Sequence, residues 1–200
     1  MSEIFSNFAL MNRYSNPSFE GLDLQYWHDL IESRGELVSL KRGEYLSRKG
    51  EPNKTFGYVK SGYLIYKIDG MHKPTAIGGF VFAGALWGNY PNCMYDEDAM
   101  YDIVAGKKTE VWMMDATVLP QLYKEDSYAC QQGRIYMEAM FKSLVQSYRS
   151  LCSKTPMQRY LDLIHSYSYI EQDLPQKEIA EYLQIDPITL CRIKKALLKQ

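Results

Sequence analysis

The C-terminal stretch LPQKEIAEYLQIDPITLCRIKKALLKQ, residues 174–200, predicts two short helices joined by a tight turn. Asp173 and Gln176 have the D-x-x-Q spacing of a capping box, which marks the start of the first helix. Asp186 is a favourable N-cap for the second helix, and Pro187 suits its first position because no partner is needed for an N–H there. Two short helices with these start signals indicate a helix-turn-helix.

The second of these helices has one apolar face and one open face. Leu190, Ile193 and Leu197 recur at helical spacing and should pack inward. The other side chains should face outward: Ile188, Thr189, Cys191, Arg192, Lys195 and Lys199. A short helix with polar and basic residues on its open face fits a DNA major groove. The alternative is an ordinary helical hairpin that closes a domain and presents a basic face to solvent.

Composition indicates a globular, intracellular protein. The chain has 200 residues, of which 46% are hydrophobic and 24% charged, so it can bury a core in one large domain or in a larger and a smaller one. Its cysteines stand apart without a C-x-x-C pair, which argues against a zinc or iron–sulfur site and fits free thiols. The longest apolar run, residues 76–88, is shorter than the ~20 residues of a membrane helix. We expect a cytoplasmic protein without a metal, cofactor or membrane partner.

The middle of the chain predicts strands between helices. Residues before Gly35 repeat at helical spacing, whereas from Leu37 the apolar period becomes two and glycines punctuate it. Residues 63–68 form one expected strand, Asp69-Gly70 a hairpin turn, and residues 109–114 the last strand. Many short strands with glycine turns indicate an antiparallel barrel or sandwich, whose interior must be filled by side chains or a small ligand.

Helical spacing returns after Pro120. The apolar positions of this helix form a stripe wide enough for two surfaces, one toward the barrel and one toward a partner helix. The alternative is a single helix packed on its own domain. Thr155-Pro156 then has the N-cap and first-position residues of a new helix, so we place a domain boundary at about Ser153. The stripe consists of Tyr136, Met137, Met140, Phe141, Leu144, Val145, Tyr148, Leu151 and Cys152.

In this order of elements, and in several short motifs, the chain resembles the Crp–Fnr superfamily of bacterial transcription regulators, and most of all the short branch common in Bacteroidetes. The N-terminal motifs resemble the turns of a cyclic-nucleotide-binding β-roll: residues 41–46 (KRGEYL), 49–51 (KGE) and 59–62 (VKSG). The C-terminal motifs are more specific: residues 155–160 (TPMQRY), 175–180 (PQKEIA) and 189–193 (TLCRI).

The resemblance implies an α+β fold with three parts. Residues 1–118 would form an N-terminal helix and an antiparallel β-roll, the jelly roll of cyclic-nucleotide-binding domains. Residues 119–152 would form a long dimerisation helix, and residues 153–200 a helix-turn-helix domain. In the implied homodimer, two recognition helices would enter half-sites about one DNA turn (~34 Å) apart. The dimer contacts would come from Met137, Met140, Phe141, Leu144, Tyr148 and Leu151.

The resemblance also implies roles in DNA contact. Arg192 matches a base-contacting arginine, whose guanidinium can bond to guanine O6 and N7. Thr189 and Lys195 are better placed for phosphates, as is Lys177 at the start of the first helix. Lys199 extends the basic face.

Two positions depart from the family pattern in the helix-turn-helix. Ile188 stands where a glutamate is frequent, and isoleucine can contact only a thymine methyl or other hydrocarbon, so base recognition is expected to be altered or weaker. Gln184 stands where a turn glycine is usual, which predicts mild strain if the turn needs a positive φ.

The ligand pocket departs further. In the segment that would hold a cyclic nucleotide, Gly84, Ala85 and Leu86, alanine replaces the glutamate that grips the ribose. Ala99 and Met100 stand where the phosphate arginine and its polar neighbour belong, within an acidic stretch, residues 96–102. A buried phosphate needs positive charge or several donors, so cyclic AMP is not expected to bind. Two alternatives remain: an apolar or cationic ligand, or an interior filled by the protein's own tyrosines and tryptophans.

These observations predict a homodimeric transcription regulator that binds double-stranded DNA, with RNA polymerase and an unidentified effector as further partners. The alternative is a β-roll that binds a ligand or protein and whose helix-turn-helix no longer recognises DNA. His72 beside the hairpin turn could be a haem ligand by family analogy, but a surface histidine is the simpler interpretation. No serine–histidine–acid or paired-carboxylate pattern indicates an enzyme.

Overall fold

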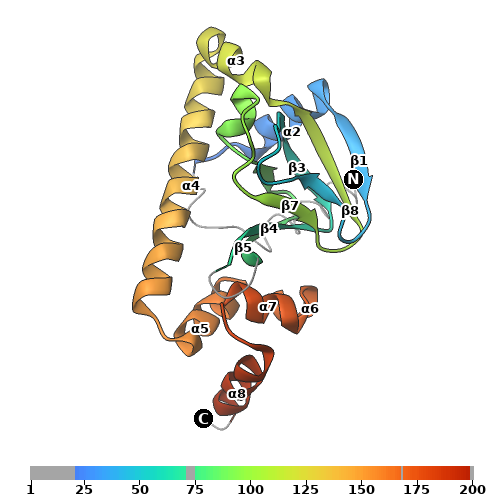
Figure 1. Cartoon of the computed structure of the whole chain (residues 1–200). Coiled ribbons are helices and arrows are strands. Elements are labelled where there is room, and N and C mark those ends of the chain that lie inside the picture. The colour runs from blue at the N-terminus through green and yellow to red at the C-terminus, as the bar shows by residue number, and fades with distance from the viewer. Residues whose placement is uncertain (1–20, 71–74, 168, 199–200) are drawn as a thin grey trace, which may run out of the picture. The chain divides into compact units, whose positions relative to one another are not determined.

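The computed structural model describes residues 21–70, 75–167 and 169–198. The chain forms two compact units, Met1–Ala139 and Met140–Gln200. Figure 1 shows that the division falls inside one uninterrupted helix, α4 (Ser127–Ser153). The sequence-based boundaries at 118/119 and 152/153 stay a prediction. The N-terminal part of the expected first helix, residues 1–20, lies outside the described residues, as do His72 and Lys199.

The first unit contains two four-stranded sheets, in which every paired strand is antiparallel. One sheet has the order β1-β8-β3-β6 and the other β2-β7-β4-β5. The antiparallel barrel or sandwich expected from the alternating pattern is therefore confirmed, as is the β-roll that the resemblance implies. The strands are β1 (Glu36–Leu40), β2 (Tyr45–Ser47), β3 (Thr55–Ser61), β4 (Tyr63–Asp69), β5 (Thr75–Phe82), β6 (Leu86–Gly88), β7 (Asp102–Ala105) and β8 (Thr109–Asp115).

The turns of the roll follow the expected signals. The hairpin of β4 and β5 is present, with Asp69 paired to Thr75, so residues 70–74 connect the strands rather than a two-residue turn. Gly62 links β3 and β4 with a φ of +87°, and a Cβ there would lie 2.5 Å from the Thr109 hydroxyl oxygen. Only glycine fits both this left-handed backbone and this close approach.

The two sheets enclose a common core. Its buried members come from strands of both sheets, which is what the period-two pattern requires of a sandwich. Partly buried side chains, including Leu46, Tyr66, Ala85 and Tyr101, pack around it. The buried members are Leu40, Val59, Leu64, Val81, Trp87, Ile103, Ala105 and Val111.

Helices cover this roll. α2 (Leu24–Arg34) begins at Asp23, whose carboxylate accepts a hydrogen bond from the Tyr26 amide, and ends at Gly35. Its fully buried Trp27 meets Phe56 of β3 edge to face at a centroid distance of 5.5 Å. Two short 3-10 helices, η2 (Asn92–Tyr95) and η3 (Ala116–Val118), complete this part.

The segment expected to be one helix, residues 119–152, forms two. α3 (Leu119–Glu125) stops at Asp126, and α4 follows. The Asp126 carboxylate accepts hydrogen bonds from the amides of Tyr128 and Ala129, as an N-cap does. The capping aspartate therefore explains why the helical pattern is interrupted.

The second unit contains α5 (Pro156–Ser166), α6 (Ile170–Asp173), α7 (Gln176–Tyr182) and α8 (Pro187–Leu197). Thr155 caps α5 in a capping box with Gln158, as its Thr-Pro signal predicts. The capping box expected between Asp173 and Gln176 is wrong. Asp173 is itself helical at the end of α6, so it cannot adopt the extended backbone of an N-cap, and α7 starts after Pro175 without a side-chain cap.

Candidate nucleic-acid interface

The turn between α7 and α8 is closed by backbone hydrogen bonds. The amide of Ile185 donates to the carbonyl of Ala180 at 3.0 Å, and that of Gln184 to Glu181 at 3.1 Å. Gln184 has a φ of +55°. These are the two bonds and the left-handed residue of a Schellman motif, in which glycine is the usual occupant. The turn therefore does need a positive φ at Gln184, the condition under which the sequence predicts mild backbone strain.

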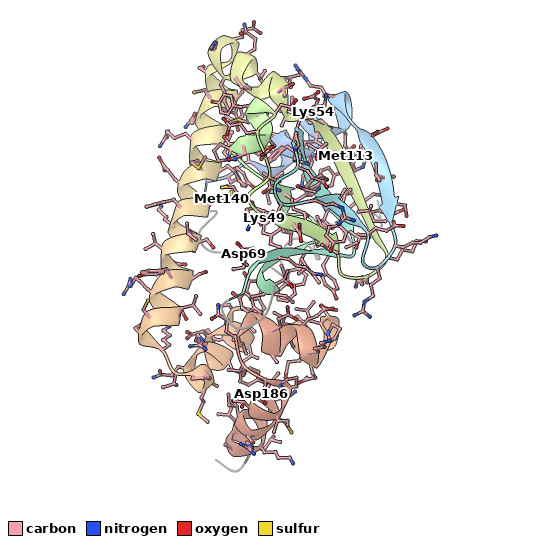
Figure 2. All side chains as sticks on the ribbon, in the orientation of Figure 1. Lys49, Lys54, Asp69, Met113, Met140 and Asp186 are labelled. Carbon is pink, nitrogen blue, oxygen red and sulfur yellow. The ribbon has the colours of Figure 1, made fainter. Side chains whose placement is uncertain are left out.

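Asp186 fixes the start of α8. Its carboxylate accepts hydrogen bonds from the amide of Thr189 at 2.8 Å and from the Thr189 hydroxyl at 2.6 Å. Figure 2 labels Asp186 in the second unit, where α8 begins. These hydrogen bonds lower the pKa of Asp186. Because Thr189 donates its only hydroxyl hydrogen to Asp186, it would have to rotate before donating to a phosphate.

The described residues of α8 have the two faces that the sequence predicts, except that Thr189 is half-buried instead of exposed. Leu190 and Ile193 are buried, and Leu197 is half-buried. On the opposite side Arg192 and Lys195 are exposed, and the Ile188 side chain is 66% exposed. Such a helix can present its outer side chains to a groove without losing its own packing.

Lys194 has a different environment from Lys195. Its ammonium group lies 2.5 Å from a carboxylate oxygen of Glu171 in α6. The same carboxylate accepts a hydrogen bond of 2.8 Å from the hydroxyl of Tyr160 in α5. Lys194 therefore links α8 to α6 and is not available to the basic face that carries Arg192 and Lys195.

Arg159 connects the start of α5 with the end of α7 through two hydrogen bonds. Its guanidinium donates to the carbonyl oxygens of Lys154 at 3.0 Å and of Leu183 at 2.8 Å. The first bond ties the start of α5, and the second the end of α7. The sequence motif that contains Arg159, residues 155–160, did not predict this role. Lys177 is exposed in the first turn of α7, which packs on α8.

The residues predicted for a nucleotide pocket lie in two places. Gly84 has a φ of +87° and donates its amide to the Val59 carbonyl at 2.7 Å. Ala85 packs against the core of the roll, and Leu86 is buried in β6. Ala99 is also buried, whereas Met100 is 51% exposed. Ala99 and Met100 thus do not supply a pair of side chains facing an anion.

Asn89 is the residue of this region that sequence reasoning missed. It is fully buried, and its amide donates to the Ser47 hydroxyl and the Tyr101 carbonyl at 2.9 and 3.2 Å. Its oxygen accepts from the amides of Met100 and Tyr101 at 3.0 and 3.3 Å. The signal available in the sequence was a polar residue directly after the apolar run of residues 76–88. Its hydrogen bonds are used to hold residues 100–101.

The outer face of α4 carries a regular apolar seam. Met137, Phe141, Leu144, Tyr148 and Leu151 are all exposed, with spacings that alternate between four and three residues. This is the a/d spacing of a coiled coil. Met140 (labelled in Figure 2), which was also predicted for the dimer contact, is half-buried and lies off this seam.

Comparison with known proteins identifies the fold. No family model and no curated protein matches the chain. Among solved structures it is similar to FixK2 of Bradyrhizobium japonicum, with 16% identity over 83% of this chain and 85% of that one and a TM-score of 0.71. A CooA variant of Carboxydothermus hydrogenoformans matches with 14% identity, 86% and 79% coverage, and a TM-score of 0.67.

A third similar structure is CLP of Xanthomonas campestris, a regulator described as responsive to c-di-GMP. It shares 14% identity over 88% of this chain and 92% of its own, with a TM-score of 0.63. At identities of 14–16%, the likeness to these three structures shows the fold of this chain. The chain has their fold, a cyclic-nucleotide-binding-like β-roll followed by a helix-turn-helix, and the resemblance found in the sequence motifs is confirmed at this level.

Within residues 21–70, 75–167 and 169–198, no helix is both long and apolar enough to cross a membrane. Over the same described positions, no group of three His, Cys, Asp or Glu side chains could hold a metal ion.

Proposed function

We propose that the chain is a homodimeric, DNA-binding transcription regulator of the Crp–Fnr type that does not respond to cyclic AMP. The observation that carries the proposal is the geometry of α8. This helix is N-capped by Asp186, packed through Leu190 and Ile193, and exposes Arg192 and Lys195 on the other side. A helix held in this way can enter a major groove as a rigid element.

Within this proposal Arg192 contacts a base and Lys195 the backbone. Arg192 is exposed and lies three residues from both Thr189 and Lys195, so the three share one helical face. A guanidinium can donate two parallel hydrogen bonds to guanine, whereas an ammonium is a point charge suited to phosphate. Lys177 and Lys199 would add backbone contacts.

The dimer would form along the α4 seam. Five exposed apolar side chains at heptad spacing would leave a continuous hydrophobic strip in water in a monomer. A second copy of α4 would bury this strip by the same residues, as two-fold symmetry requires. RNA polymerase as a partner remains a prediction from the family resemblance, and the cytoplasm as the location remains a prediction from the composition.

Insensitivity to cyclic AMP follows from the pocket residues. Ala85 and Ala99 offer no charge or hydrogen-bond donor from their side chains, and exposed Asp96 and Glu97 lie near Ala99 in the chain. A phosphate brought into this region would lose water without gaining a cationic partner. Isothermal calorimetry with cyclic AMP is expected to show no binding at physiological concentrations, and a micromolar Kd would contradict the assignment.

DNA binding is tested with a site selected from a random pool and a scrambled control. Arg192→Ala should weaken binding to the selected site by about 5- to 150-fold while weak binding to scrambled DNA persists. Lys195→Ala should weaken binding to both DNAs and lower the slope of log affinity against log salt by about 1. Lys194→Ala, one residue away but paired with Glu171, is the matched control and should leave the salt slope unchanged.

The second candidate function is a ligand- or protein-binding β-roll whose helix-turn-helix does not recognise DNA. The exposed Ile188 favours it, because an apolar side chain in this position cannot accept a hydrogen bond from cytosine. Failure of the wild-type protein to enrich any DNA sequence would support this candidate. Equal losses on both DNAs for Arg192→Ala would reduce Arg192 to a backbone contact.

A further inference from the structure

We propose that Tyr66, Trp87 and Tyr101 form an internal plug that takes the place of an effector, so that the β-roll keeps its DNA-binding state without any small molecule. The inference rests on the proposed function, since it concerns the regulation of that function. It selects the filled interior from the two alternatives that the sequence leaves open.

Gly88 of β6 is held between two tyrosine hydroxyls. Its carbonyl oxygen accepts a hydrogen bond of 2.9 Å from Tyr101, and its amide donates to the Tyr66 hydroxyl at 3.4 Å. The two rings lie together with a centroid distance of 4.9 Å. β6 belongs to one sheet, whereas Tyr66 lies in β4 of the other and Tyr101 directly precedes β7. The tyrosines therefore link the two sheets from inside.

Trp87 fills the space beside this link. It is fully buried, and it lies across from Gly57 of β3. A Cβ on Gly57 would come within 2.9 Å of the Trp87 indole nitrogen and 1.9 Å of the Trp112 carbonyl oxygen. The missing side chain at Gly57 thus leaves room for the indole nitrogen to approach this strand closely.

The plug occupies the region predicted for a ligand. Ala85, which stands in place of the ribose-binding glutamate, packs against the same core cluster as Tyr66 and Tyr101. Asn89, the residue after Gly88, donates hydrogen bonds from its side-chain amide to the Ser47 hydroxyl and the Tyr101 carbonyl. Its side-chain oxygen accepts hydrogen bonds from the backbone amides of residues 100–101. The Asn89 amide group is therefore already hydrogen-bonded within the protein, whereas the buried indole nitrogen of Trp87 has no hydrogen-bond partner.

The plug is also uncharged. Burial raises the pKa of both Tyr66 and Tyr101 above the ordinary value, so both phenols stay protonated at neutral pH. A neutral aromatic interior stabilises the roll by packing and hydrogen bonding instead of by capture of an anion. An effector that must bind here would first have to displace side chains that already join the two sheets.

The first test uses the wild-type protein. It is unfolded in urea, dialysed to remove small molecules, refolded, and assayed for binding to its selected DNA site. The plug predicts the same affinity before and after this treatment. An affinity that falls at least tenfold and returns when a small-molecule fraction of cell extract is added would overturn the proposal.

The second test opens the plug. Tyr101→Ala should lower the thermal midpoint of the first unit by roughly 5–15 °C, and 4-methylphenol, which contains the lost phenol ring, should raise it again. The midpoint of the wild-type protein should not respond to 4-methylphenol. Tyr95→Ala is the matched control, because Tyr95 is 60% exposed and its loss opens no interior space.

Two outcomes separate this proposal from the proposed function. If Tyr101→Ala does not fold, Tyr101→Phe removes only the hydroxyl bond to Gly88 and should lower the midpoint without a response to 4-methylphenol. A folded Tyr101→Ala protein that ignores 4-methylphenol, or a wild type that is stabilised by it, contradicts the plug. If the wild type binds no DNA while 4-methylphenol rescues Tyr101→Ala as expected, only the DNA-binding function is contradicted.

Discussion

Arg159 donates a hydrogen bond of 2.8 Å to the carbonyl oxygen of Leu183, the residue that ends α7. The same guanidinium donates to Lys154 before α5. One side chain therefore connects the residues just before α5 with the turn of the helix-turn-helix. The bond satisfies a carbonyl that no helical amide reaches at a helix end.

Arg159→Met should destabilise the second unit by about 1.5–3 kcal/mol, because it removes charged donors from two carbonyls and keeps much of the apolar stem. All three tryptophans, Trp27, Trp87 and Trp112, lie in the first unit. The helical signal in circular dichroism should therefore lose stability while the tryptophan fluorescence transition stays unchanged. Arg149→Met, at an exposed position of α4, is the control. A shift of the fluorescence transition alone would place the destabilisation in the first unit and contradict the prediction.

Gln184→Gly should stabilise the second unit by up to about 1 kcal/mol, because glycine adopts a positive φ without the Cβ clash of glutamine. Gln176→Gly makes the same substitution in the first turn of α7 and should instead destabilise it. Urea denaturation followed by circular dichroism measures both. If the two variants lose equal stability, the left-handed strain at Gln184 is absent in solution.

Leu144→Glu should convert the proposed dimer into a monomer with a folded β-roll. A carboxylate at a d position would be buried against its own copy across the two-fold axis, where like charges repel. Sedimentation velocity at micromolar concentration measures the change, and tryptophan fluorescence checks the fold. Gln146→Glu adds the same charge two residues away, off the seam, and should remain a dimer. A wild-type monomer under these conditions would contradict the seam.

The stability of the first unit should fall as the pH drops below about 6.5, the ordinary pKa of histidine. Burial lowers the pKa of His28, against the opposing effects of its bond to Gly84 and of Glu32 and Asp29. Its ring stacks on Tyr58 at 3.9 Å, and its Nε2 bonds the Gly84 carbonyl at 2.9 Å. The unfolded chain thus binds a proton more readily than the folded one, so acid favours unfolding.

His28→Gln keeps a donor for Gly84 but does not titrate. The difference in unfolding free energy between wild type and His28→Gln, followed by tryptophan fluorescence, should therefore change between pH values of about 7.5 and 5.5. The stability of the wild type should decline relative to the variant as acid is added. A constant difference would show that His28 is not buried as a neutral ring.

The four cysteines should react with a thiol reagent in two classes. Cys93 is buried, and burial raises the pKa of its thiol to about 12, whereas Cys130, Cys152 and Cys191 are exposed. Since the thiolate is the reactive form, Cys93 should react only after unfolding. Titration of the native protein should count three fast thiols, and Cys93→Ser should leave that number unchanged. Four fast thiols in the native wild type would contradict the burial of Cys93.

Much of the fold follows from local signals in the sequence. The change of apolar period at Leu37 and the return to helical spacing after Pro120 predicted the order of strands and helices. Thr155 and Asp186 predicted two helix starts, and both form the expected caps. Local signals failed where a competing element used the same residue, as at Asp173, which ends α6 instead of capping α7.

The buried polar contacts depended on the tertiary structure. His28 meets Gly84 across 56 positions of the chain, Asn89 meets Ser47 across 42, and Arg159 meets Leu183 across 24. No periodicity or spacing relates such pairs. Caps and amphipathic faces are determined by residues within one or two turns, so the sequence alone determines them. A buried donor must find its acceptor wherever the packed chain places one, and only the fold decides where that is.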